Sequence, residues 1–277
     1  MSTLEGQVAF ITGAGRGQGR SHAEALAERG VDIIAVDLCE DIDTVSYPLA
    51  TPSDLDETAA AVKAHGRRVV TYQADVRDMR GLSRALNAGL SEFDRLDIVL
   101  ANAGIAPSFG LDIEPADSWG NIIDVNLTGV WNTVWVTKQA IIDGKRGGSI
   151  VITSSTAGLK GLADGSPGAD AYVASKHGLV GLTKATALEA ARDGITCNAL
   201  CPGFIHTNIV DRQIDDQTRL SGWTRERIMD ELILSKHPTK EFVRVEDVAA
   251  FALFLCSDAG SAVTGTALSI DGGWVAT

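Results

Sequence analysis

Short apolar runs recur along the chain, and longer amphipathic stretches separate them. The first run, at 7–12, ends in a glycine-rich turn, and 17–29 then carries apolar residues at helical spacing. The run at 31–37 is almost continuously apolar, which is typical of a parallel strand buried on both faces. The same alternation predicts five further strands, at 68–74, 97–101, 148–153, 196–200 and 267–270.

Alternating strands and helices predict an α/β fold in which the crossovers are right-handed. We therefore expect a single domain over residues 1–277, a doubly wound Rossmann fold whose seven-stranded parallel sheet carries helices on both faces. The length suits one hydrophobic core, and no internal repeat or Pro/Ser-rich linker marks a domain boundary.

Two segments break this alternation. Residues 38–58 are rich in turn formers and lack a clean period, so we predict an insertion between the second strand and its crossover helix. Residues 204–242 mix polar and apolar positions over a length that ordinary connections do not reach. Segments of this kind often close over a ligand, so we predict a substrate lid there.

Charge and cysteine content exclude several classes of protein. With 36 acidic and 24 basic residues the net charge is -12, which disfavours binding to nucleic acid or to an anionic membrane surface. No apolar run is long enough to span a bilayer and residues 1–6 lack a signal-peptide pattern, so we expect a cytoplasmic protein. The four cysteines form no CxxC pair and no cluster with histidine, which predicts reduced thiols and no metal site.

A glycine-rich turn lies where the first predicted strand meets the first predicted helix, and its sequence is TGAGRGQG. Glycines there let the backbone turn tightly and approach a pyrophosphate at the helix N-terminus. A turn needed only for packing is the alternative, but the position in the first strand–turn–helix unit favours a dinucleotide site. The residues of this turn that we expect to contact the cofactor are Gly13, Arg16, Gly17, Gln18 and Gly19.

Asp37 ends the second predicted strand, where a carboxylate can accept hydrogen bonds from the adenosine ribose hydroxyls. A 2′-phosphate at that place would add about two negative charges beside the carboxylate. The sequence therefore predicts NAD as the cofactor. Arg16 is a counter-signal, because its guanidinium could pair with such a phosphate, and NADP stays open as the alternative.

Further candidate cofactor contacts follow the predicted strands at their carboxyl ends, where ligands of open α/β sheets bind. Asp and Asn after strands are more often turn formers than ligands, so their position in the repeated pattern carries the prediction. These candidates are Leu38, Asp75, Val76, Asn102, Ala103 and Gly104.

Tyr172 and Lys176 are spaced i, i+4 on a predicted helix and therefore lie on one face. An ammonium close to the phenol stabilises the phenolate, so we expect Lys176 to lower the pKa of Tyr172. An isolated pair at this spacing is common in ordinary amphipathic helices. Ser155 after the fifth predicted strand and Asn126 on the preceding helix favour the catalytic interpretation.

These motifs, in this order and at about this spacing, resemble those of the short-chain dehydrogenase/reductase family over essentially the whole chain. The resemblance implies an NAD-dependent oxidoreductase that interconverts a secondary alcohol and a ketone. It implies that Tyr172 is the acid/base and that Lys176 holds the nicotinamide ribose. It also implies that Ser155 orients the substrate oxygen and that Asn126 anchors a proton-relay water. Ser154 stays open as the alternative to Ser155, because the spacing to Tyr172 is longer than usual for the family.

The resemblance carries two further expectations. One is that the segment after the sixth strand supports the nicotinamide carboxamide, through Pro202, Gly203, Ile205 and Thr207. The other is a homotetramer, since the family commonly pairs the helices of Asn126 and Tyr172 between subunits. Trp131 and Trp135 lie i, i+4 on the first of these helices, where we expect packing or subunit contact.

Gln18 in the glycine-rich turn and the insertion after Asp37 resemble the actinobacterial carveol-dehydrogenase-like branch, which is linked to the redox carrier mycofactocin. That resemblance implies a small, apolar, terpenoid-like alcohol such as carveol as the substrate, and tightly held NAD. The insertion could cover the adenosine half of NAD through Ile42 or Tyr47, or it could be a harmless surface excursion. Two other functions stay open: a redox-silent NAD-binding sensor, and an NADP-linked reductase of the 3-ketoacyl type.

Overall fold

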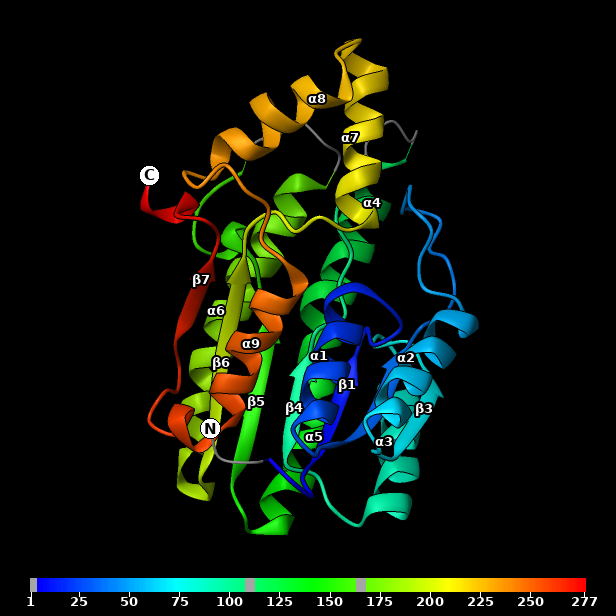
Figure 1. Ribbon diagram of the computed structural model, residues 1–277, viewed down its shortest axis with the longest axis vertical. Coiled ribbons are helices and arrows are strands. Elements are labelled where there is room, and N and C mark those ends of the chain that lie inside the picture. The colour runs from blue at the N-terminus through cyan, green and yellow to red at the C-terminus, as the bar shows by residue number, and fades with distance from the viewer. Residues whose placement is uncertain (1–3, 108–112, 163–167) are drawn as a thin grey trace.

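The computed structural model describes residues 4–107, 113–162 and 168–277 and contains one seven-stranded parallel sheet of order β3-β2-β1-β4-β5-β6-β7 (Figure 1). This confirms the predicted fold class, and the strand ends differ from the prediction by no more than two residues. The strands are β1 (Val8–Thr12), β2 (Asp32–Asp37), β3 (Val69–Gln73), β4 (Ile98–Ala101), β5 (Gly148–Thr153), β6 (Ile195–Pro202) and β7 (Ala267–Ile270).

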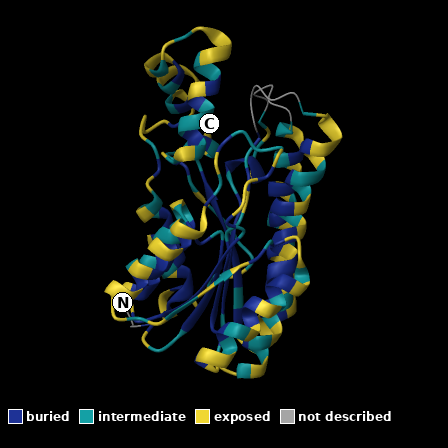
Figure 2. Cartoon of the chain, turned by 90° about the vertical axis from the view of Figure 1, so that its right-hand side faces the viewer, coloured by how far each residue is buried: buried dark blue, intermediate teal, exposed yellow. Residues whose placement is uncertain are grey.

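Helices cover both faces of the sheet, so the five central strands are buried on both sides, whereas the edge strands β3 and β7 are partly exposed (Figure 2). Side chains alternate along each strand: Phe10 and Ile34 join one hydrophobic cluster, whereas Ile11 and Ile33 join another. The first cluster is covered by α3 (Met79–Phe93), α5 (Gly129–Gly144) and α6 (Ala169–Ala190). The second is covered by α1 (Gly17–Glu28), α2 (Pro52–Ala64) and α9 (Val245–Cys256).

The insertion is shorter than the sequence predicted, because α2 already begins at Pro52. Thr51 accepts a hydrogen bond from the backbone of Asp54, and the Asp54 side chain bonds back to Thr51, which forms a capping box with proline at the first helical turn. The interpretation of 52–58 as irregular chain was therefore wrong, since the Thr51-Pro52 turn is a helix start. The insertion proper ends at Thr51.

The predicted lid is largely helical. It contains α7 (Asn208–Ser221), α8 (Arg225–Ile228), a π turn at Met229–Ile233 and a 3-10 turn at Leu234–Lys236. These elements have a small apolar cluster of their own, formed by Val210, Ile214, Ile228 and Ile233. Figure 1 shows α7 and α8 extending beyond the end of the sheet at which β6 leads into them.

Candidate active site

A cavity of about 550 Å³ opens at the carboxyl ends of the strands, on both sides of the point between β1 and β4 where the strand order reverses. Its volume lies within the range that holds small-molecule ligands, roughly 300–1,000 Å³. Of the residues that the sequence predicted for the site, those that line it are Gly13, Arg16, Gly17, Gln18, Asp37, Leu38, Asp75, Val76, Asn102, Ala103, Gly104, Ser155, Tyr172, Lys176, Pro202, Gly203, Ile205 and Thr207.

The glycine-rich turn packs tightly against the end of β4. Gly13 has a φ of +66°, and a Cβ added there would lie 2.9 Å from the Cα of Ala103. A Cβ on Gly19 would overlap the carbonyl group of Gly13, so Gly19 lies beneath the turn and does not line the cavity. Gly19 thus has a packing role, because no side chain fits between the helix and Gly13, and the cofactor contact expected of it stays a prediction.

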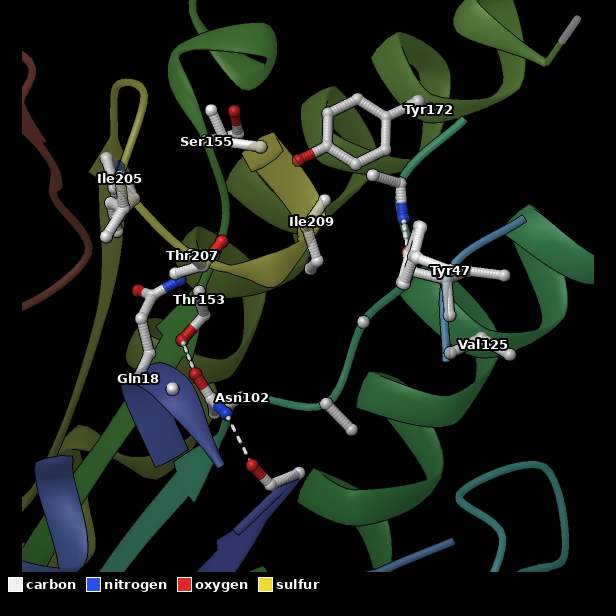
Figure 3. Close-up of a pocket in the computed structure, with 18 of the residues that line it drawn as sticks. Gln18, Tyr47, Asn102, Val125, Thr153, Ser155, Tyr172, Ile205, Thr207 and Ile209 are labelled. Atoms are coloured by element: carbon white, nitrogen blue, oxygen red, sulfur yellow. Dashed lines mark hydrogen bonds between the residues drawn. The ribbon is translucent and has the colours of Figure 1, made fainter. Parts of the chain in front are cut away.

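Polar side chains tie the strand ends together below the cavity. The hydroxyl of Thr12 accepts the backbone N–H groups of Asn102 and Ala103 at 3.1 and 3.2 Å. The amide of Asn102 donates to the carbonyl of Thr12 at 3.1 Å and its oxygen accepts from the hydroxyl of Thr153 at 3.2 Å. Asn102 thus fixes the turn against β5, and Figure 3 draws its hydrogen bond with Thr153.

Arg20 braces the outer side of the same turn, and the sequence did not single it out. Its guanidinium donates to the carbonyl of Gly15 at 2.7 Å and to the hydroxyl of Thr58 at 3.1 Å, and it forms an ion pair with Glu57 at 2.8 Å. An arginine on an amphipathic helix normally faces solvent, so no local pattern distinguishes this one. The contacts join the turn to α2.

Asp37 lies at the edge of the cavity with 9% of its surface exposed. One carboxylate oxygen accepts the N–H of Gly15 at 2.8 Å and the other accepts the N–H of Cys39 at 3.2 Å. Since a carboxylate has about four acceptor positions, each oxygen can accept one more hydrogen bond. Arg16 also lines the cavity, so both the predicted ribose ligand and its counter-signal lie at the site.

The polar atoms of the cavity fit a dinucleotide. The side-chain oxygen Oε1 of Gln18 is buried without a hydrogen-bond partner among the described residues. Figure 3 shows the Gln18 amide directed toward Thr207, near the chain that the sequence assigned to the nicotinamide carboxamide. An unsatisfied buried amide oxygen is costly, and a carboxamide N–H is a donor that matches it.

Ser155, Tyr172 and Lys176 converge on one wall of the cavity. Ser155 precedes a 3-10 turn after β5, and Tyr172 and Lys176 come from the first half of α6. Figure 3 shows the hydroxyl of Tyr172 directed to the side of the cavity on which Ser155 lies. Lys176 is buried, and its Nζ donates to the carbonyl of Thr153 at 2.9 Å.

Burial is the main cause of the pKa shifts of Tyr172 and Lys176 in this wall. Burial raises the pKa of Tyr172, and a hydrogen bond with Ser155 opposes that rise. Burial lowers the pKa of Lys176 to about 8. The expected lowering of the Tyr172 pKa by Lys176 is thus not found, because Nζ turns toward Thr153 and lies 5.6 Å from the centre of the tyrosine ring.

Ser154 and Ser155 point to different surroundings. The hydroxyl of Ser154 is buried and donates to the carbonyl of Lys176 at 2.9 Å, which anchors α6 to β5. Ser155 is partly exposed to the cavity and accepts the N–H of Ala157 at 3.1 Å. The geometry therefore favours Ser155 as the residue that reaches a substrate.

A pair of alanine variants tests this choice. We expect Ser155→Ala to lower kcat/KM by about 10–100-fold, since it removes one donor to the substrate oxygen. Ser154→Ala should keep the rate within about threefold and lower the unfolding midpoint, because it removes a buried hydrogen bond. Loss of turnover in Ser154→Ala, with an active Ser155→Ala, would reverse the assignment.

Asn126 does not line the cavity, unlike the other three predicted catalytic residues. It lies fully buried in a π turn at Asp124–Thr128, a feature often found at functional sites. Its amide accepts the N–H of Ile105 and donates to the carbonyl of the same residue, both at 2.8 Å. Asn126 thus fixes the position of the chain that follows β4. The role in a proton relay that the sequence predicted for Asn126 would depend on the position of that chain.

The insertion reaches three other parts of the site. The hydroxyl of Tyr47 accepts the N–H of Ala106 at 2.7 Å, which ties the insertion to the chain after β4. Thr44 accepts the side-chain amide of Asn121 in α4 (Pro115–Ile123) at 3.1 Å. Ser46 donates to Asp216 in α7 at 3.4 Å. These partners lie far from the insertion in the sequence, so no local pattern could indicate the three contacts.

Metal and membrane features are absent from the described part of the chain. Residues 4–107, 113–162 and 168–277 contain no group of three or more His, Cys, Asp or Glu side chains that could hold a metal ion. None of their helices combines the length and apolarity needed to cross a bilayer. The four cysteines are buried free thiols, as the sequence predicted.

The fold and the site together define the class of protein. A sheet with strand order 3-2-1-4-5-6-7 carries a glycine-rich turn after β1 and a Ser, a Tyr and a Lys on one cavity wall. The family profile described as enoyl-(acyl carrier protein) reductase matches residues 13–275. The chain belongs to the short-chain dehydrogenase/reductase family.

Within this family the chain is similar to carveol dehydrogenases. It is 44% identical to (-)-trans-carveol dehydrogenase of Rhodococcus erythropolis over 278 residues, which cover 99% of each chain. The solved structure of carveol dehydrogenase from Mycobacterium avium in complex with NAD matches 100% of both chains at 41% identity, with a TM-score of 0.91. A short-chain dehydrogenase from Mycobacterium paratuberculosis bound to NAD also covers 100% of both, at 37% identity and a TM-score of 0.85. The predicted resemblance is confirmed.

Proposed function

We propose that this protein is an NAD-dependent dehydrogenase that interconverts a small apolar secondary alcohol and its ketone. The observation that carries the proposal is the convergence of Ser155, Tyr172 and Lys176 on one wall of a cavity that the glycine-rich turn and Asp37 also line. The NAD named in the structures of two similar proteins supports the choice of cofactor.

In the direction of alcohol oxidation, Ser155 and Tyr172 hold the substrate hydroxyl, and Tyr172 accepts its proton as the carbonyl forms. Bound NAD supplies the hydride acceptor. The ammonium of Lys176 would bind the nicotinamide ribose and so position the nucleotide beside Tyr172. In ketone reduction the same tyrosine returns the proton, and the raised pKa of Tyr172 keeps it protonated for that direction.

The substrate we propose is a terpenoid-like alcohol such as carveol. Apolar side chains line the substrate end of the cavity, among them Ile105, Val125 and Ile209, and the name of the relative from Rhodococcus erythropolis points to the same class. The test is oxidation of (-)-trans-carveol by the purified protein, followed with added NAD and with an artificial electron acceptor. No carvone under either condition would exclude carveol as the substrate.

We further propose that NAD is held tightly and that a mycofactocin-type carrier reoxidises it in a cytoplasmic setting. The insertion supports this, because Ile42, Tyr47, Leu49 and Ala50 line the cavity beside Asp37. A Cβ on Gly15 would lie 2.8 Å from the Cβ of Ala50, so the insertion packs directly on the glycine-rich turn.

We expect about one nucleotide per chain in extensively dialysed protein, released by denaturation and identified by mass spectrometry. Replacing residues 42–50 by a short Gly-Ser turn keeps the Thr51 cap of α2 and should speed NAD release at least tenfold, because three anchoring hydrogen bonds are lost. Ser46→Ala is the matched control and should change the release rate little. Equal release from the shortened and intact proteins would contradict the proposed cover.

The proposed assembly is a homotetramer. Trp131 and Trp135 stack on the outer face of α5 with ring centres 5.4 Å apart, although 41% and 57% of their surfaces are exposed. A second copy that covers this pair would remove a large apolar area from water. No nucleic acid or membrane partner is proposed, in keeping with the net charge of -12.

Multi-angle light scattering should give the mass of four chains for the wild type. Trp135→Glu should lower that mass at micromolar concentration, because it places a charge in the apolar contact. Arg29→Glu, directly after α1 at the opposite face of the sheet, is the control and should leave the mass unchanged. A monomeric wild type would refute the tetramer.

A further inference from the structure

Tyr47 carries the insertion into the cavity that Tyr172 also lines. Its side chain lines the same cavity as Tyr172, and only 3% of its surface is exposed. Figure 3 shows Tyr47 in the region between Tyr172 and Val125, with Ile209 on the facing side. A segment that leaves the nucleotide-binding strand β2 therefore also forms a wall of the substrate compartment.

The hydroxyl of Tyr47 already accepts one hydrogen bond and can still donate one. Its oxygen accepts the N–H of Ala106 at 2.7 Å, but no residue in 4–107, 113–162 or 168–277 accepts its hydrogen. Because Tyr47 lines the cavity, this donor is open to an acceptor that a ligand could supply. Burial raises the pKa of this phenol, the N–H of Ala106 opposes the rise and Tyr172 adds to it. Tyr47 thus stays a donor at neutral and moderately alkaline pH.

The surroundings of that donor decide which acceptor fits. Val125 and Ile209 present hydrocarbon, so the body of a bound substrate at this place is apolar. Of the nearby cations, Lys176 is already bonded to the carbonyl of Thr153 and Arg16 belongs to the glycine-rich turn. A carboxylate placed among these hydrocarbon side chains would be costly to desolvate, whereas a neutral oxygen needs only the one donor that Tyr47 offers.

We propose that Tyr47 is a specificity-determining residue that donates a hydrogen bond to a second, neutral oxygen of the substrate, remote from the carbon served by Tyr172. The substrate class is a hydroxyketone or diketone on a hydrocarbon skeleton, or the corresponding diol. The proposal rests on the proposed function and refines it: the redox chemistry at Tyr172 is unchanged, and Tyr47 selects for the remote oxygen.

Matched ketones test the proposal. Single-turnover oxidation of enzyme-bound NADH is measured with 3- and 4-hydroxycyclohexanone and with 3- and 4-methylcyclohexanone, which works whether or not the nucleotide exchanges. The methyl group replaces the hydroxyl at nearly equal size. We expect the wild type to prefer one of the hydroxyketones about 5–10-fold over its methyl counterpart, the effect of one hydrogen bond.

Tyr47→Phe should bring this ratio to about one, whatever the change in the absolute rates. The ratio is independent of the fraction of folded protein, so a destabilised variant remains informative. Ile209→Val, which trims the same compartment and keeps the donor, should preserve the preference. Equal rates in the wild type, or a preference that survives in Tyr47→Phe, would overturn the role of Tyr47. If wild-type NADH is oxidised by none of the four ketones, the proposed function itself fails.

Discussion

Tyr172→Phe is expected to lower kcat/KM for alcohol oxidation by about 10²–10⁴-fold, the contribution of a positioned acid/base group. The ring and its packing on α6 are kept, so the change removes only the hydroxyl that exchanges the proton. Because Tyr172 faces the same cavity as Ser155 and Lys176, no described neighbour on that wall offers an equivalent group of matching acidity.

The affinity for nucleotide, measured by calorimetry or by the amount retained on dialysis, should stay within about threefold in the variant. Tyr72→Phe on β3 is the matched control, since it removes a tyrosine hydroxyl away from the cavity, and its rate should equal that of the wild type. The redox-silent sensor predicts no turnover in either the wild type or the variant. Full activity in Tyr172→Phe would remove the proposed acid/base.

Asp37→Asn is expected to raise the ratio of kcat/KM with NADP to that with NAD by about two orders of magnitude. A carboxylate beside a 2′-phosphate costs roughly 3–4 kcal/mol at an effective dielectric of ~20. Asn is preferred to Ala here, because Asp37 accepts the N–H groups of Gly15 and Cys39 on its two oxygens and Asn retains an acceptor for one of them. Asp37→Ala should shift the preference too, with a larger loss of stability.

The measurement is the full set of kcat/KM values for both nucleotides in both proteins, with nucleotide-free enzyme prepared in the same way. Glu40→Gln removes an exposed charge from the same insertion and should leave the ratio unchanged. An unaltered ratio in Asp37→Asn would contradict the assignment of the ribose ligand. It would also reopen the NADP-linked reductase of the 3-ketoacyl type, for which Arg16 would hold the phosphate.

The sheet could be predicted from the sequence, because the pattern that marks each strand lies within a few consecutive residues. A parallel strand buried on both faces must be apolar along its length, as 31–37 is, and the helix that follows must keep one apolar face. The glycine-rich turn and Asp37 lie at strand ends that the topology brings together, so placing the strands also placed these residues.

The sequence-based predictions failed for two reasons. Some motifs fit two local structures equally well, and some contacts join residues that are far apart in the sequence. Thr51-Pro52 reads equally well as a turn and as a helix start, and only the hydrogen bonds with Asp54 distinguish the two. Asn126 is separated from Ile105 by 21 positions and Tyr47 from Ala106 by 59. Such pairs leave no periodic trace, since each depends on how two loops meet after the sheet has formed.

The hydrogen bonds that anchor the insertion affect the order in which product and nucleotide leave the enzyme. Of the three anchors of the insertion, only the contact of Ser46 with Asp216 involves α7, whereas Thr44 is bonded to Asn121 and Tyr47 to Ala106. We expect a substrate to pass beneath α7 and a departing nucleotide to need all three contacts separated. We therefore expect products to leave many times for each exchange of nucleotide. Each turnover would then end with a reduced cofactor still in place, and an oxidant arriving through the substrate entrance would have to reset it.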